Sequence, residues 1–97
     1  MMVIEIAMVP VLAGHEKQFE DALDEAARTV LPQASGFLHF HATGWCVERP
    51  HVFAFQIAWA TLEDHTVGFR ESELFTQWRA LIGPHFDGAP MVEHFAL

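Results

Sequence analysis

The stretch VFAFQIAWA, residues 52–60, decides the fold. In an extended chain, alternate side chains point to opposite faces of the strand. Large apolar side chains occupy every second position here and therefore share one face: Phe53, Phe55, Ile57 and Trp59. The other face carries a second apolar set around Gln56: Val52, Ala54 and Ala58. A strand that is apolar on both faces belongs to a sheet that needs a cover on both faces.

Three further strands are expected around this one. Residues 2–9 are rich in β-branched and apolar types and stop before Pro10. Residues 37–47, FLHFHATGWCV, should pair with residues 52–60 as a hairpin with a short turn around Pro50. Residues 90–95, PMVEHF, follow a loop and complete the set.

Two helical regions lie between these strands. Residues 13–32 carry one apolar stripe at helical spacing, which is typical of an amphipathic helix: Phe19, Ala22, Leu23, Ala26, Ala27, Val30 and Leu31. Thr61, with Asp64 three residues later, is expected to cap a short helix over 62–70. A further helical segment begins at Ser72 and stops at the Gly83-Pro84 pair.

The resulting order, β-α-β-β-α-β, predicts one α+β domain over residues 1–97 with the ferredoxin-like split fold. Right-handed crossovers place both helices on one face of a four-stranded antiparallel sheet. The other face is then bare. Because 52% of the residues are hydrophobic, above the usual ~45–50%, we expect a homodimer to form through the open sheet face.

Charge and cysteine content narrow the function classes. The net charge is −8, and the five basic residues are scattered, so neither nucleic acid nor a membrane surface is an expected partner. No apolar run approaches the ~18–20 residues of a membrane span. Cys46 is the only cysteine, which favours a reducing compartment, and we expect a cytoplasmic protein.

The pair His39 and His41 projects from one side of its strand and could begin a metal site. A metal centre needs at least three ligands, but the next positions offer no carboxylate before Glu48. Alternatively, the pair lies at the dimer interface, on one face with Phe37, Thr43 and Trp45, or reaches a pocket and hydrogen-bonds a substrate. Metal is the least favoured of these interpretations.

Trp59 ends its strand, and His65 lies in the first turns of the helix that follows. With Phe69 and Trp78, these side chains could wall a flat apolar cleft that contains one titratable group. A histidine is suited to taking a proton near neutral pH. The competing interpretation is plain core packing. Arg70, followed by Glu71 and Glu73, is expected to form a surface ion pair.

The segments WATLEDHTVGFRES (59–72), FTQWRALIGP (75–84) and PMVEHF (90–95) resemble the antibiotic biosynthesis monooxygenase family of dimeric α+β barrels. The resemblance implies a pocket between sheet and helices in each subunit. It also implies oxygenation of an electron-rich aromatic without a cofactor, with His65 as the base and Trp59 beside it as catalytic residues. The side chains expected to contact substrate are Phe55, Phe69, Trp78, His39 and His41.

The chain departs from two branches of that family. It contains no asparagine, and Phe69 stands where the haem-degrading branch is expected to carry its iron-ligating histidine, so we expect neither haem nor a metal as cofactor. It also has no tyrosine, which the polyketide oxygenases use. The first hypothesis is therefore a cofactor-independent monooxygenase of a small quinol, phenol or anthrone. The alternative is a non-catalytic dimeric barrel that binds a small apolar ligand or acts as an interaction module.

Overall fold

The computed structural model describes residues 1–97 and confirms the expected order of elements. The strands are β1 (Val3–Pro10), β2 (Phe37–Trp45), β3 (Val52–Trp59) and β4 (Met91–Ala96). The main helices are α1 (Glu16–Thr29) and α2 (Glu73–Ile82). Three short helical segments complete the chain: η1 (Leu31–Gln33), the π-helical η2 (Asp64–Phe69) and η3 (Gly83–His85). The sheet has the order β2-β3-β1-β4, with antiparallel neighbours throughout. These features make the chain a ferredoxin-like α+β fold.

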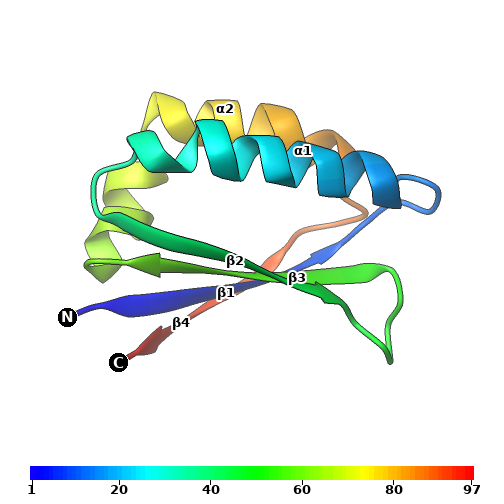
Figure 1. Cartoon of the computed structure of the whole chain (residues 1–97), viewed down its shortest axis with the longest axis horizontal. Helices are drawn as coiled ribbons and strands as arrows, with labels where there is room; N and C mark the ends of the chain where they lie inside the picture. The colour runs from blue at the N-terminus through cyan, green and yellow to red at the C-terminus, as the bar shows by residue number, and fades with distance from the viewer.

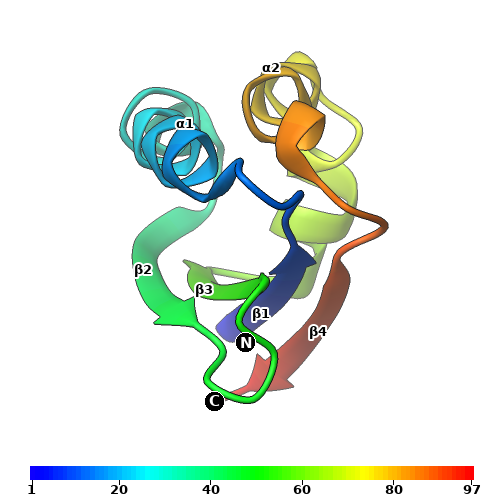
Figure 2. The same cartoon turned by 90° about the vertical axis from the view of Figure 1, so that its right-hand side faces the viewer.

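Helices α1 and α2 lie side by side on one face of the sheet, and the other face is uncovered (Figures 1 and 2). The core fills the layer between them. Strand β1 places alternate residues in that layer, namely Val3, Ala7, Val9 and, at the same periodicity, Glu5. The four large side chains predicted to share a face of β3 also lie there, and each is less than 5% exposed: Phe53, Phe55, Ile57 and Trp59. Burying a side chain of this size contributes roughly 1.5–3 kcal/mol.

Strand β2 differs from the expected alternation because it contains two irregularities. Its pairing with β3 shifts register between Phe37 and His39, and again between Ala42 and Gly44. Each shift moves the following side chain to the other face of the sheet. Phe37 and Trp45 therefore pack against the core, and the prediction that they share a face with His39 was wrong.

Segment η2 is held against the start of β2 at Gly36. The Ala60 amide donates to the Gly36 carbonyl at 2.8 Å. Thr61 and Asp64 cap one another's backbone amides, each at 3.1 Å, as the sequence predicted. Gly36 has φ +82°, and a Cβ there would overlap the Asp64 carboxylate. Glycine is therefore required both by the backbone conformation and by the closeness of the Asp64 side chain.

The open face of the sheet is apolar at its centre. Cross-strand pairing brings Ile4 beside Ala58 and Phe95, and Ile6 beside Gln56 and Glu93. Phe95 is 48% exposed and Met91 is 56% exposed. Contiguous exposed apolar patches often mark a surface that binds another protein molecule. None of the helices has the length and hydropathy needed to cross a bilayer.

Candidate active site

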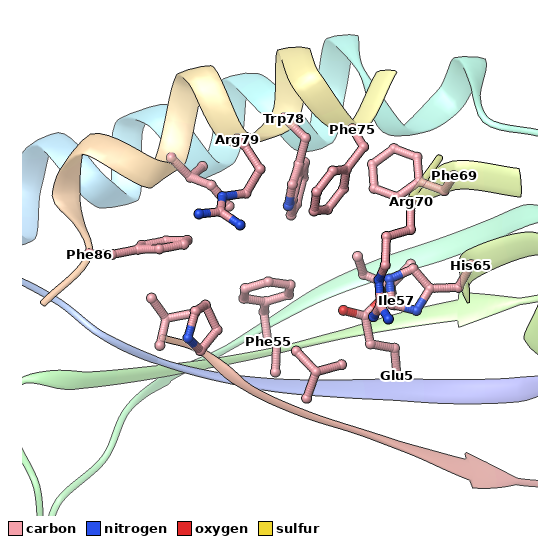
Figure 3. Close-up of a pocket in the computed structure, with 15 residues that line it drawn as sticks. Glu5, Phe55, Ile57, His65, Phe69, Arg70, Phe75, Trp78, Arg79 and Phe86 are labelled. Carbon is pink, nitrogen blue, oxygen red and sulfur yellow. Dashed lines mark ion pairs between the residues drawn. The ribbon is translucent and has the colours of Figure 1, made fainter. Parts of the chain in front are cut away.

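A cavity of about 300 Å³ lies between the sheet and α2. Strands β1 and β3 form its floor, and η2 and α2 form its walls (Figure 3). Two thirds of its lining residues are hydrophobic. Four of the predicted site residues line it together: Phe55, His65, Phe69 and Trp78. The structure therefore has a ligand-sized cavity where a plain core was the competing interpretation.

A buried carboxylate, Glu5, lies at one end of the cavity. It is 5% exposed, and the indole Nε1 of Trp59 donates to its Oε1 at 3.0 Å. Figure 3 shows an oxygen of Glu5 turned toward the interior of the pocket. Burial raises the pKa of Glu5 to about 7, although the Trp59 hydrogen bond and the nearby Arg70 charge both lower it. Glu5 is therefore close to half-ionised at neutral pH.

Trp59 is fully buried and does not line the cavity. Its indole lies behind the two titratable groups: it donates to Glu5 and stacks on the imidazole of His65, with ring centroids 5.2 Å apart and planes at 12°. Because Trp59 touches both groups without facing the cavity, it fixes their positions.

His65 joins two partners. Its Nε2 lies 3.4 Å from Glu5 Oε1, and its Nδ1 lies 2.7 Å from Nε2 of His94. Burial, followed by the charges of Arg70 and His94, lowers the pKa of His65 to about 4. His65 is therefore neutral at pH 7. Both of its ring nitrogens already face protein groups.

His94 extends this chain of groups to the edge of the sheet. It lies directly opposite Glu5 in the β1–β4 ladder, and β4 is an edge strand. The side chain is half-buried. Burial is also the main cause of its lowered pKa, followed by the charge of Arg70. Glu5, His65 and His94 thus form a connected series from the buried end of the cavity to the surface.

Arg70 lines the cavity, and the expected surface ion pair with Glu71 or Glu73 was wrong. Figure 3 shows its side chain reaching down toward His65 and Glu5. The cause is the π-helical turn, in which the Arg70 amide bonds the His65 carbonyl at 3.0 Å. In an α-helix, a residue five positions on lies about 140° round the axis. The wider π turn reduces this angle and brings Arg70 closer to the side of His65, and such turns often occur at functional sites.

His39 and His41 lie away from this cavity. Both are exposed and pair with Ala58 and Gln56, on the open face of the sheet. The structure has no group of three or more histidine, cysteine or carboxylate side chains placed to hold a metal ion. The substrate-binding role predicted for this pair therefore finds no support in the arrangement of one subunit.

Sequence reasoning did not identify Glu5, Arg79 or His94 as residues of this site. The sequence did contain a signal for Glu5. It is the only charged residue in an otherwise apolar strand, and its position places it on the same face of the strand as Val3 and Ala7. Arg79 had no comparable signal. It lies on α2 and lines the cavity near Phe86.

A comparison with protein families places the chain among known sequences. The model of the antibiotic biosynthesis monooxygenase family matches residues 2–81. The chain belongs to this family. The YczJ protein of Bacillus subtilis (strain 168) is 39% identical over 94 residues, which cover 97% of both chains.

Solved structures agree with this assignment. A protein of Bordetella bronchiseptica assigned to the same family superposes with a TM-score of 0.92 at 32% identity, covering 99% of this chain and 96% of that one. SnoaB, a cofactor-independent oxygenase from Streptomyces nogalater, superposes with a TM-score of 0.76. At 10% identity, with 99% of this chain and 92% of SnoaB covered, that likeness establishes a shared fold only.

Proposed function

We propose that this protein is a cofactor-independent monooxygenase that oxidises a small electron-rich aromatic, such as a quinol, phenol or anthrone, with O2. The observation that carries the proposal is the buried Glu5–His65 pair at the end of an apolar cavity. SnoaB, on the same fold, is described as a cofactor-independent oxygenase. Chemistry of this kind requires only orientation, exclusion of water and a proton acceptor.

The cavity suits a small ring system. A cavity of roughly 150 Å³ binds one benzene molecule, so about 300 Å³ holds a substituted ring or a fused pair. Phe55 and Trp78 supply apolar faces for such a ring, with their own centroids 5.9 Å apart at 69°. A flat, mostly apolar ligand is therefore the best match to the walls.

We assign the first proton transfer to the Glu5–His65 pair rather than to His65 alone. Both Glu5 and His65 line the cavity, but the two ring nitrogens of His65 already face Glu5 and His94. A general base works best with a pKa near the operating pH, and the pKa of Glu5 is about 7. Glu5 is the group that meets the substrate hydroxyl in this proposal.

His65 then carries the proton outward. A neutral imidazole can accept a proton at Nε2 and release one from Nδ1, so proton transfer through His65 leads to His94 and the surface. The 2.7 Å contact between His65 and His94 already has hydrogen-bond length. The 3.4 Å contact to Glu5 is longer, and catalytic hydrogen bonds commonly tighten once substrate is bound.

The redox step balances without a further reductant. The deprotonated quinol gives one electron to O2, and the resulting radical and superoxide combine to form a C–O bond. The base returns its proton to the peroxide. The oxygenated ring carbon then loses its own proton as the O–O bond breaks, so that water leaves and a hydroxyquinone remains. The sum is quinol plus O2 to hydroxyquinone plus water. Arg70, which lies beside Glu5 and His65, stabilises the substrate anion and the superoxide electrostatically.

We further propose that two copies associate through the open sheet face. The support is its apolar centre, with Ile4, Ile6 and Phe95 on adjacent strands. The pair His39 and His41 lies at the β2 edge of the same face, where a partner could meet it.

Oxygen uptake tests the proposed activity. Protein treated with a chelator is mixed with a panel of hydroquinones and anthrones, and the rate is compared with that of His65→Ala, His65→Gln and the exposed control His51→Gln. We expect uptake above the buffer blank, a loss of roughly 10²–10⁴-fold in both His65 variants and no change in the control. No uptake, or equal rates in all proteins, contradicts the proposal. Saturable binding without uptake supports the non-catalytic alternative instead.

A further inference from the structure

Two arginines of this acidic chain face the cavity without an acidic partner. The chain has 13 acidic residues and only five lysines and arginines. Lys17 and Arg28 form ion pairs along α1 at 2.9 and 3.0 Å. Arg70 and Arg79 both line the cavity, and neither has a carboxylate oxygen within 4.0 Å. Arg49, in the turn between β2 and β3, is also unpaired, so the cavity holds two of the three unpaired arginines. Both cavity arginines are partly exposed to solvent and place positive charge at the rim of an apolar pocket.

Arg79 is held between aromatic rings. Its guanidinium carbon lies 5.4 Å from the centroid of Phe86 and 5.9 Å from that of Phe75. Figure 3 shows the guanidinium group directed into the pocket, on the side of Phe86. Cation–π contacts of this kind restrain an arginine and leave the N–H donors in its guanidinium plane free for a ligand.

The two cations serve different ends of the cavity. The charge of Arg70 acts on Glu5, His65 and His94, so it belongs to the end where the proton is removed. Arg79 lies with Phe86, and Figure 3 places it apart from Glu5 and His65. Arg79 is therefore available for a part of the ligand that does not react.

We propose that the ligand is an aromatic acid whose carboxylate binds Arg79. A carboxylate entering an apolar cavity loses its hydration and needs a charged donor in return. Guanidinium groups bind carboxylates through two parallel hydrogen bonds. The aromatic ring then lies along Phe55 and Trp78. Its hydroxyl group reaches Glu5 and Arg70 at the other end. The orientation of the hydroxyl rests on the proposed oxygenase function, whereas the carboxylate contact does not.

The overall charge of the protein gives this proposal a specific consequence. A net charge of −8 repels anions at long range. Selection of an acid must therefore come from short-range contacts within the cavity. Because Arg70 lies at the reacting end, Arg79 supplies them in this proposal. Loss of that one charge should remove the preference for an acid over its neutral ester.

Binding without oxygen tests the proposal. Under anaerobic conditions, 2,5-dihydroxybenzoate and its methyl ester are titrated separately into the protein, and binding is followed by calorimetry and tryptophan fluorescence. The proteins are wild type, Arg79→Gln, Arg79→Lys and the control Arg28→Gln, which loses the same charge on α1. Circular dichroism confirms that each variant is folded.

We expect the wild type and Arg28→Gln to bind the acid at least tenfold more tightly than the ester. Arg79→Gln should lose this preference, and Arg79→Lys should keep part of it. The proposal is overturned if the wild type does not bind the acid at millimolar concentration, if it binds the ester as tightly, or if Arg79→Gln retains the preference. Acid binding without oxygen uptake would leave this proposal standing and remove the oxygenase.

Discussion

His65 Nδ1 lies 2.7 Å from His94 Nε2, although the two residues are 29 positions apart in the chain. The contact joins the π-helical segment η2 to the edge strand β4. One ring must donate and the other accept at this distance. It links the buried end of the cavity to a half-buried side chain and is the basis of the proposed proton path.

Replacing His94 with phenylalanine should slow turnover while leaving substrate affinity unchanged. Phenylalanine keeps a flat ring at this position, but it cannot accept a hydrogen bond or a proton from His65. We expect kcat to fall roughly 10- to 100-fold, within the usual range of an acid–base contribution, and KM to stay constant. Added imidazole should restore part of the rate, because His94 is half-buried. A rise in KM without a change in kcat would contradict the relay.

The rate should depend on the ionisation of Glu5. Its pKa is about 7, and only the ionised carboxylate accepts a proton. The kcat/KM of the wild type should therefore rise with pH and level off above pH 7. Glu5→Gln should be slow at every pH and lack this rise. A rise near pH 7 that survives in the variant would assign it to another group.

Glu5 should also make stability depend on pH. Its pKa is raised from 4.5 to about 7 by burial, so the folded state binds more protons than the unfolded state between these values. Stability is highest below pH 4.5 for this group and falls as the pH rises to 7. Glu5→Gln removes the free-energy cost of ionising a buried carboxylate. We therefore expect the stability of the variant relative to wild type to increase by up to about 3 kcal/mol as the pH rises from 4.5 to above 7. Urea unfolding at pH 4.5 and 8 measures the difference. A constant difference contradicts the assigned pKa.

The Gly36 contact offers a test of how η2 is held. Gly36 and Gly14 have nearly the same positive φ, +82° and +85°, but only Gly36 is crowded by Asp64. An alanine at either position costs about 1–2 kcal/mol for the backbone conformation. We expect Gly36→Ala to cost about 1–3 kcal/mol more through overpacking and to lower activity by moving His65. Equal unfolding free energies in the two variants would show that the contact is unimportant.

The open sheet face should govern assembly. Ile6 lies on this face between Gln56 and Glu93, so Ile6→Lys places a charge within the proposed interface. We expect sedimentation to report a dimer for wild type and a monomer for the variant. Gln18→Lys on the exposed surface of α1 adds the same charge and should remain dimeric. A monomeric wild type would contradict the proposed interface.

Most of the fold could be predicted from local sequence patterns. The alternation over Val52–Trp59 and the stripe from Phe19 to Leu31 each depend on a short local stretch of chain, and both were confirmed, although α1 ends at Thr29 and Leu31 begins η1. The two irregularities in β2 could not be predicted from local sequence patterns. A bulge depends on how β2 meets β3, and only Gly44 offered a local sign of it.

The walls of the candidate site were easier to predict than its charged groups. Phe55, Phe69 and Trp78 follow from the periods of their strand and helices. Arg70 was missed because the π turn changes which helical residues share a side. The contact between His65 and His94 arises from tertiary structure, since it requires the sheet order to place β4 next to β1.

The balance of oxygen during turnover tests the central claim most directly. Hydroquinone is added to chelator-treated protein in an oxygen electrode, and catalase is added after the reaction ends. A monooxygenase should consume one O2 per quinol, form hydroxyquinone and water, and show no return of oxygen with catalase. Return of half the consumed oxygen would reveal hydrogen peroxide and a simple oxidase. That result, or uptake equal to that of His65→Ala, would contradict the proposed function.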